Sequence, residues 1–114
     1  MLSEALRIPT VVGRRMRARR EALGWAQEKV GVLIGIDESS SRARISRYEL
    51  GTHEPPVKTA RLLAQALGVS LTYLYCDDDG VAALLLQLHR LDGVVLRRVV
   101  DQAMTLAAQA RREA

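Results

Sequence analysis

The sequence predicts an all-helical protein, and three observations support that fold class. Apolar residues recur at helical spacing along nearly all of the 114 residues, and the pattern breaks at glycine and proline. No stretch alternates apolar and polar residues in the way that a half-buried strand does. A content of 48% hydrophobic and 26% charged residues is typical of one soluble domain with a modest core, which excludes a disordered tail and a two-domain enzyme.

Five helices are expected in the first two thirds of the chain. Thr10 can cap the first of them, Pro55 and Pro56 favour the start of the fourth, and Ser70 can cap the short fifth. The expected helices lie within residues 11–23, 27–34, 37–50, 57–67 and 71–75. A glycine follows each of the first four, at positions 24, 35, 51 and 68, and can adopt the left-handed backbone that ends a helix.

Two further helices are expected in the last third of the chain. The acidic residues 77–79 can start a sixth helix, because their charge suits its positive N-terminal end, and this helix reaches about residue 91. Asp92 and Gly93 interrupt the pattern. A seventh helix then runs from about residue 94 into the last residues of the chain.

Positive charge is concentrated in the first half of the chain. Residues 1–61 hold 12 basic and 7 acidic side chains, whereas residues 62–114 hold 5 and 6. Fifteen of the 17 basic residues are arginine, whose planar guanidinium fits phosphate groups and guanine edges. The charge therefore indicates a polyanion as partner, while an ordinary solvated basic surface remains the alternative.

Several short motifs occur in a fixed order between residues 13 and 75. They are Arg20, LGWAQ at 23–27, ISRYELG at 45–51, the proline pair at 55–56 and LAQALGVSLTYLY at 63–75. In this ordered set the chain resembles the XRE family, the helix-turn-helix domains of the Cro and lambda-repressor kind. The resemblance covers a little over half of the chain. It implies a five-helix, lambda-repressor-like domain whose third helix enters the major groove of DNA.

The third helix divides into an inner and an outer face. At about 100° per residue, Ile45, Tyr48 and Glu49 point inward, and the arginines and serines around them point outward, with Arg44 at the border. The resemblance adds Gln27, at the start of the second helix, as a contact of a DNA phosphate. The expected DNA-binding residues are Gln27, Ser41, Arg42, Ala43, Arg44, Ser46 and Arg47. A solvated charged face would look similar, but three arginines without an interleaved acid favour a nucleic acid.

The resemblance gives structural roles to three other residues. Arg20 and Glu49 match a family pair that forms a buried ion pair. Gly31 matches a small residue that lets the second and third helices approach closely. The remaining candidates for contact with the DNA backbone are Arg14, Arg15, Arg17 and Arg19.

Two features depart from the family pattern. Ala26 precedes Gln27, where the family usually has a Ser, Thr or Asn that caps the helix. Nine residues lie between Gly35 and Ile45, about four more than the family's short turn needs. The extra residues, close to one helical turn, either lengthen the third helix with Asp37 as its cap or form a serine-rich loop.

The last two helices carry more apolar surface than one domain needs. The seventh helix is apolar over about half of its circumference, against a stripe of about 100° for a helix packed on one core. In the sixth helix, Leu86 points away from the face formed by Val81, Leu84, Leu85, Leu88 and Leu91. Pairing with a second copy is the preferred interpretation, and folding back onto the same domain is the alternative. The expected dimerisation residues are Leu86, Val95, Val99, Val100, Met104 and Leu106.

The residues that could carry chemistry form no catalytic or metal-binding set. His53 and His89 have no second ligand at the spacing that a metal site needs, and the serines have no partner base. We therefore expect no enzyme activity, no metal and no cofactor. The lone Cys76 cannot form an internal disulfide, and no apolar run approaches about 18 residues, so a cytoplasmic protein without a membrane span is expected.

These observations together predict the organisation and the function of the chain. Residues 1–10 form an N-terminal arm, residues 11–76 the DNA-binding domain and residues 77–114 a two-helix dimerisation extension. The expected function is that of a transcriptional regulator that binds double-stranded DNA sequence-specifically, as a homodimeric repressor that reads an inverted repeat. The alternative is an antitoxin or protein-interaction module whose C-terminal helices bind a partner protein and whose DNA binding is autoregulatory. The sequence does not identify a small-molecule effector, which stays unknown.

Overall fold

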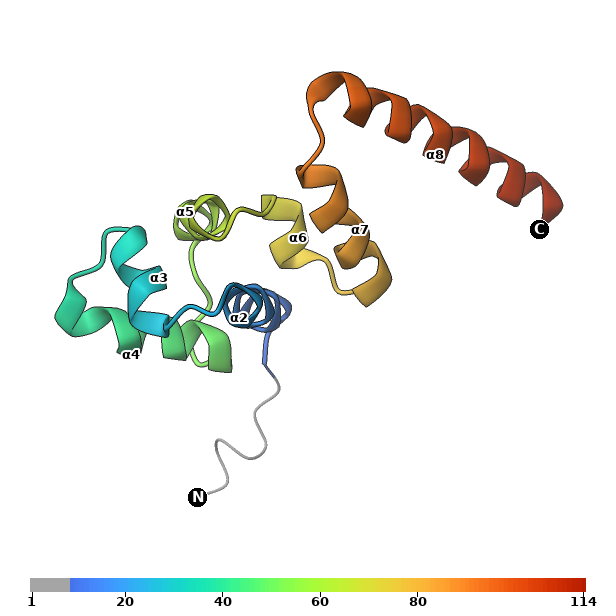
Figure 1. Ribbon diagram of the computed structural model, residues 1–114. Coiled ribbons are helices and arrows are strands. Elements are labelled where there is room, and N and C mark those ends of the chain that lie inside the picture. Colours follow the sequence, from blue (N-terminus) through green and yellow to red (C-terminus); the bar gives the residue numbers. More distant parts are fainter. Residues whose placement is uncertain (1–8) are drawn as a thin grey trace.

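A computed structural model describes residues 9–114 of the chain, and every regular element in this range is a helix (Figure 1). The helices are α2 (Val11–Leu23), α3 (Gln27–Leu33), α4 (Glu38–Leu50), α5 (Val57–Leu67), α6 (Leu71–Tyr75), α7 (Asp79–His89) and α8 (Gly93–Glu113). The predicted all-helical fold class is therefore confirmed. Residues 1–8, which make up most of the expected N-terminal arm, lie outside the described residues.

Four helices begin at a side chain that caps their free N–H groups. The Thr10 hydroxyl accepts a hydrogen bond from the N–H of Gly13 at 3.1 Å, and Ser70 caps α6 with a bond of the same length. Asp78 and Asp92 cap α7 and α8 with their carboxylates. The glycines at positions 24, 35, 51 and 68 all have positive φ angles, from 68° to 91°. Local residues therefore set most of the helix ends where the sequence predicts them.

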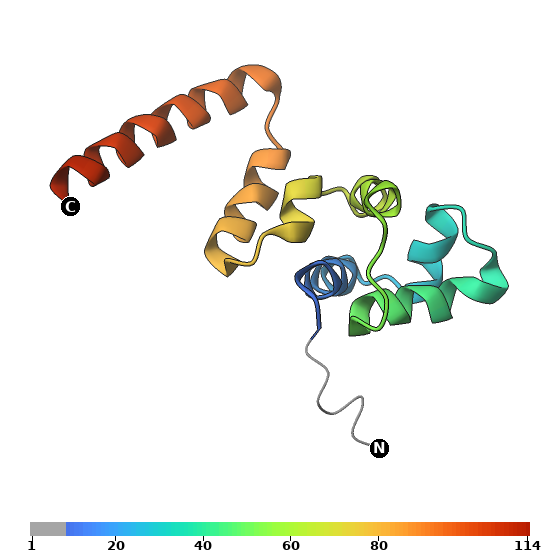
Figure 2. The ribbon, with the colours of Figure 1, turned by 180° about the vertical axis from the view of Figure 1, so that it is seen from behind.

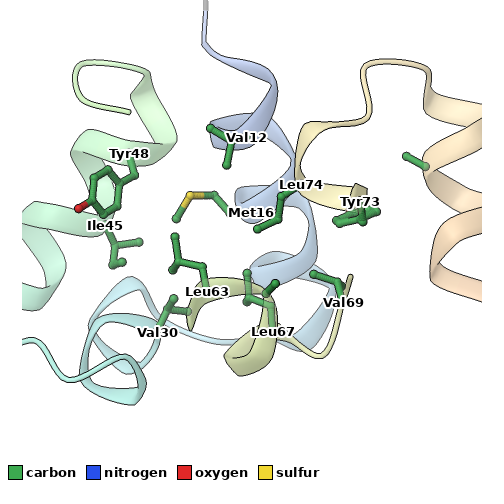
Figure 3. Close-up of a cluster of buried hydrophobic side chains, with 12 residues drawn as sticks. Val12, Met16, Val30, Ile45, Tyr48, Leu63, Leu67, Val69, Tyr73 and Leu74 are labelled. Carbon is green, nitrogen blue, oxygen red and sulfur yellow. The ribbon is translucent and has the colours of Figure 1, made fainter. Parts of the chain in front are cut away.

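Helices α2 to α6 enclose one apolar core (Figure 3). Side chains from all five helices point towards one another around Met16 of α2 and Leu63 of α5. The buried members of the cluster are Val12, Met16, Val30, Ile45, Tyr48, Leu63, Ala64, Leu67, Val69, Tyr73, Leu74 and Ala82. Because burial of one such side chain contributes about 1.5–3 kcal/mol, this cluster supplies the main force that holds the helices together.

Two glycines let α4 lie close to its neighbours. A Cβ atom added at Gly13 of α2 would lie 2.6 Å from the carbonyl oxygen of Tyr48 and 2.8 Å from that of Glu49. A Cβ atom added at Gly31 of α3 would lie 2.5 Å from the Cβ of Ser41. The close approach that the resemblance implies at Gly31 is therefore present, and α4 is held near both of its ends.

An ion pair joins α2 to the last turn of α4. The Nε of Arg20 donates to Oε2 of Glu49 at 2.7 Å, and its Nη2 donates to Oε1 at 3.0 Å. The Nη1 of Arg20 donates to the carbonyl oxygen of Trp25 at 2.9 Å. The side chains of Arg20 and Glu49 are only 13% and 2% exposed. The hydrogen bonds to Glu49 raise the pKa of Arg20, against the lowering effect of burial, so the guanidinium stays charged.

Two other arginines of α2 hold later parts of the chain. The Nε of Arg15 donates to the carbonyl oxygen of Cys76 at 2.7 Å, and its Nη2 lies 2.9 Å from Oδ1 of Asp79. The Nε of Arg19 donates to the carbonyl oxygen of Leu67 at 2.9 Å. Arg15 and Arg19 therefore join α2 to the ends of α5 and α6 and the start of α7, and their expected contact with the DNA backbone stays a prediction.

Helix α7 packs on the domain through a face that only partly matches the predicted one. Ala82 is buried in the core, and Leu85 and Leu86 are half-buried against it. Val81 and Leu84, which the pattern places on the inner face, are exposed. Leu86, which the pattern points away from the inner face, packs against the core, because Ala82 lies four residues earlier on the same side of the helix. A role of Leu86 in dimerisation stays a prediction.

Helix α8 extends away from the other helices (Figures 1 and 2). None of its 21 residues is buried, and Leu96, Val99 and Val100, near its start, are half-buried. Met104 and Leu106, in its second half, are 67% and 66% exposed. The rest of the described chain therefore leaves most of the apolar face of α8 uncovered.

Replacement of Gly13 by alanine tests the contact between α2 and α4. Alanine favours an exposed helix by about 1 kcal/mol over glycine, but here the added methyl group meets two backbone oxygens. We expect Gly13→Ala to lower the free energy of unfolding by about 1–3 kcal/mol in urea denaturation. Gly93→Ala is the control, since nothing lies within 4 Å of an added Cβ there, and it should be neutral or stabilising. A more stable Gly13→Ala variant would contradict the contact.

Removal of the Glu49 carboxylate tests the ion pair. Glu49→Ala leaves the Arg20 guanidinium partly buried without its partner, and we expect a loss of about 3 kcal/mol, seen as a lower melting temperature. Glu21→Ala is the control, because the Arg17–Glu21 pair is more than half exposed and contributes under about 1 kcal/mol. If Glu49→Ala kept its melting temperature but changed the choice of DNA sequence, Glu49 would be a DNA ligand instead.

Candidate nucleic-acid interface

The outer face of α4 is polar and basic, whereas its inner face is buried. Ile45, Tyr48 and Glu49 are buried, as predicted. The residues expected to face outward are exposed or, in the case of Ser46, half-buried: Arg42, Ala43, Arg44, Ser46 and Arg47. The division of the helix into two faces is therefore confirmed, while the role of the outer residues stays a prediction.

Ser41 lies on the inner face, so its assignment to DNA binding is wrong. Its side chain is fully buried and packs against Gly31. Its hydroxyl donates to the carbonyl oxygens of Ile36 and Asp37, at 3.1 and 2.9 Å. Ile45 is buried four residues later in the same helix, and Ser41 shares its inward direction.

The residues inserted before Ile45 lengthen α4 and do not form a loop. The helix begins at Glu38 and runs for 13 residues. Asp37 occupies the N-cap position, as expected, but its side chain makes no capping hydrogen bond. The helix therefore gains one turn at its N-terminal end, and this turn exposes Ser39 and Ser40.

Gln27 begins α3, and its side chain already has a partner inside the domain. Its Nε2 donates to Oε1 of Glu49 at 3.1 Å, and the residue is half-buried. Ala26 provides no side-chain cap, as the sequence indicates. The amide nitrogen of Gln27 thus supports the buried carboxylate, which leaves its amide oxygen and the backbone N–H groups of the first turn uncommitted.

The arginines on the outer face of α4 have no acidic partner. Among residues 9–114, Arg42, Arg44 and Arg47 take part in no ion pair. Arg14 of α2 is exposed and also has no ion pair within that range, whereas Arg17 pairs at 3.4 Å with the glutamate four residues later. Unpaired guanidinium groups on one surface attract polyanions and can form forked hydrogen bonds with phosphate or guanine.

A shallow depression of about 410 Å³ borders one side of this face, between α4 and α5. Its polar lining includes Ser40 and Arg44 from α4 and Thr59 from α5. Ser40 and Arg44 therefore lie on the α5 side of α4, next to the depression. Ala43 and Ser46 do not line it.

Metal ligands do not gather anywhere in the described part of the chain. No three His, Cys, Asp or Glu residues between positions 9 and 114 lie close enough together to bind a metal ion. His53 and His89 are both exposed. In the same range, no helix combines the length and the apolar character that crossing a bilayer requires.

Comparison with known proteins finds related helix-turn-helix chains. The helix-turn-helix family profile matches residues 16–74. An uncharacterized HTH-type transcriptional regulator from Sinorhizobium medicae is 35% identical over 69 residues, which are 60% of this chain and 47% of that protein. The SPbeta prophage-derived uncharacterized HTH-type transcriptional regulator YonR from Bacillus subtilis is 34% identical over 62 residues, 54% of each protein. The chain therefore spans about half the length of these curated relatives.

A solved structure has a similar fold over a longer stretch. The crystal structure of the transcriptional regulator BswR matches with a TM-score of 0.77 and 37% sequence identity, and the match covers 85% of this chain and 97% of that one. The family profile spans more than half of the chain, including the whole of α3 and α4. From this match and the geometry of α4, the chain belongs to the XRE-type helix-turn-helix family.

Proposed function

We propose that this chain is a transcriptional regulator that binds double-stranded DNA sequence-specifically and acts in the cytoplasm as a homodimeric repressor. The observation that carries the proposal is the outer face of α4, which is held at both ends and presents three arginines that form no ion pair within residues 9–114. Such a helix fits the major groove of B-DNA and presents its side chains to base edges. The similar proteins are named transcriptional regulators, which supports the same function.

Arg42 and Arg47 are the proposed readers of base sequence. Each guanidinium can donate two parallel hydrogen bonds to O6 and N7 of guanine, and such a contact contributes about 1–3 kcal/mol of discrimination. Ala43 and Ser46 lie between them and suit a thymine methyl group and a base-edge hydrogen bond. Arg44 lies beside the depression at α5 and suits a phosphate at the edge of the groove.

Contacts with the DNA backbone come from α2 and from the start of α3 in this proposal. Arg14 and Arg17 lie on the helix that crosses the backbone when the third helix of such a domain enters the groove. Gln27 offers its amide oxygen and adjacent backbone N–H groups at the start of α3. These contacts supply affinity and register but carry no sequence information.

Helix α8 is the proposed dimerisation element. Most of the stability of a helix in a protein comes from packing of its apolar face, and the described residues leave most of this face of α8 uncovered, so we expect a partner to cover it. A second copy supplies an identical apolar face, formed by Val95, Val99, Val100, Met104 and Leu106. Two-fold pairing presents two α4 helices to an inverted repeat whose half-sites lie about 34 Å apart, or a multiple of it.

The exposed face of α8 also favours the alternative of an antitoxin or interaction module. In that case a different protein covers α8, and DNA binding serves only autoregulation. A second protein that copurifies with the chain in equal amount, and is lost when α8 is removed, would favour this alternative over the homodimer.

Arginine substitutions separate base readers from backbone contacts. We expect Arg42→Ala and Arg47→Ala each to reduce the preference for a selected operator over a scrambled duplex by about tenfold or more. Arg14→Ala is the control, since loss of a phosphate contact weakens binding to both duplexes equally and lowers the salt slope by about one. The measurement is fluorescence anisotropy at several salt concentrations. Equal losses on both duplexes for both α4 variants would contradict the reading role of α4.

Removal of α8 tests the dimer. Truncation after Leu91 keeps Ala82 in the core, so we expect a folded monomer in sedimentation and much weaker operator binding. Leu106→Asp places a charge on the proposed interface and should also give a monomer. Thr105→Asp is the matched control on the polar side of α8 and should remain dimeric. A truncated chain that still sediments as a dimer would contradict the role of α8.

A further inference from the structure

The added first turn of α4 is a fixed part of the domain. Ser41 holds this turn against α3, because its side chain is buried against Gly31. Its hydroxyl also bonds to the carbonyl oxygens of Ile36 and Asp37. The turn cannot unwind without opening the contact between α3 and α4. Its outward side chains are therefore positioned as firmly as those of the later turns.

Ser39 is the outward side chain of this turn on the proposed reading face. At about 3.6 residues per turn, residues four and seven positions later lie within about 40° of it around the helix axis, and these are Ala43 and Ser46. Ser39 is exposed. Ser40 is also exposed, but it lies about 100° further round and lines the depression with Arg44. Ser39 therefore continues the row of Ala43 and Ser46, whereas Ser40 lies between the line of Arg47, seven residues later, and the depression.

We propose that Ser39 reads a base edge at one end of the half-site, beyond the base pairs that Arg42 and Arg47 contact. A helix rises about 1.5 Å per residue, so Ser39 lies about 6 Å before Ala43. Successive base pairs are about 3.4 Å apart, so the added turn reaches one or two base pairs further along the groove. The ligand is the major-groove edge of a base, where a hydroxyl can donate or accept a hydrogen bond.

The charges around Ser39 favour a base edge over a phosphate. Asp37 and Glu38 precede it, both are exposed, and the first basic residue that follows is Arg42. Carboxylates repel the phosphate backbone, so this end of α4 is poorly suited to backbone contact. A carboxylate can still accept a hydrogen bond from the amino group of cytosine. Asp37 and Glu38 are therefore compatible with a place for this turn above the base edges in the major groove.

Selection of bound sequences from random duplexes tests this inference, which rests on the proposed function. The full chain is compared with Ser39→Ala and Ser39→Arg. We expect the unchanged chain to enrich a half-site motif and Ser39→Ala to lose preference at one or two adjacent base pairs at its end, by about three- to tenfold. Ser39→Arg should gain a guanine preference of about tenfold or more at those same base pairs.

Ser40 provides matched controls on the same turn. Ser40→Ala should keep the original motif, and Ser40→Arg should raise affinity for all duplexes without a new base preference. Identical motifs for the unchanged chain and both Ser39 variants would overturn the role of Ser39 and leave the proposed function standing. The role of Ser39 would also be overturned if Ser40→Arg enriched the same motif as Ser39→Arg. A Ser39 variant that fails to melt cooperatively would overturn it as well. If the unchanged chain enriches no motif, the proposed function fails, and this inference fails with it.

Discussion

The orientation of α4 depends on the buried carboxylate of Glu49. Its oxygens accept hydrogen bonds from Arg20 at 2.7 and 3.0 Å and from Gln27 at 3.1 Å, so the last turn of α4 is tied to α2 and to the start of α3. If α4 were rotated about its axis, the buried carboxylate of Glu49 would lose its hydrogen-bond donors, at a cost of several kcal/mol. The ion pair acts more through this positioning than through net stability, because desolvation of both charges offsets much of their attraction.

Close packing positions the N-terminal end of α4, as the ion pair positions its C-terminal end. Gly31 admits Ser41 at a distance that no larger residue allows, and the buried serine fixes the first turn of α4. The sequence predicts the C-terminal end of α4 and the directions of its apolar residues because local signals encode them, namely Gly51 and the spacing of Ile45 and Tyr48. It leaves open whether the inserted residues form helix or loop, since both satisfy the local pattern and the contact with α3 decides.

Contacts between distant segments account for what the sequence does not predict. The apolar residues of α7 surround the helix, so periodicity alone gives no unique inner face, and Leu86 is assigned to the wrong side. The sequence does not distinguish Arg15 and Arg19 from the exposed arginines beside them. Their acceptors are backbone oxygens at the ends of α6 and α5, and no residue type in the sequence marks such an acceptor. Gly13 was the available signal for the approach of α2 to α4, since a glycine inside a helix costs about 1 kcal/mol relative to alanine and marks a packing requirement.

NMR chemical-shift mapping shows whether the outer face of α4 reads DNA. The full chain is titrated with a duplex that carries its selected operator and, separately, with a scrambled duplex of equal length. If α4 reads the base sequence, the largest differences between the two maps fall on residues 39–47, while both duplexes perturb the start of α3 and the exposed side of α2 alike. Operator-specific changes concentrated on α5 or α8, with α4 unaffected, would contradict the account.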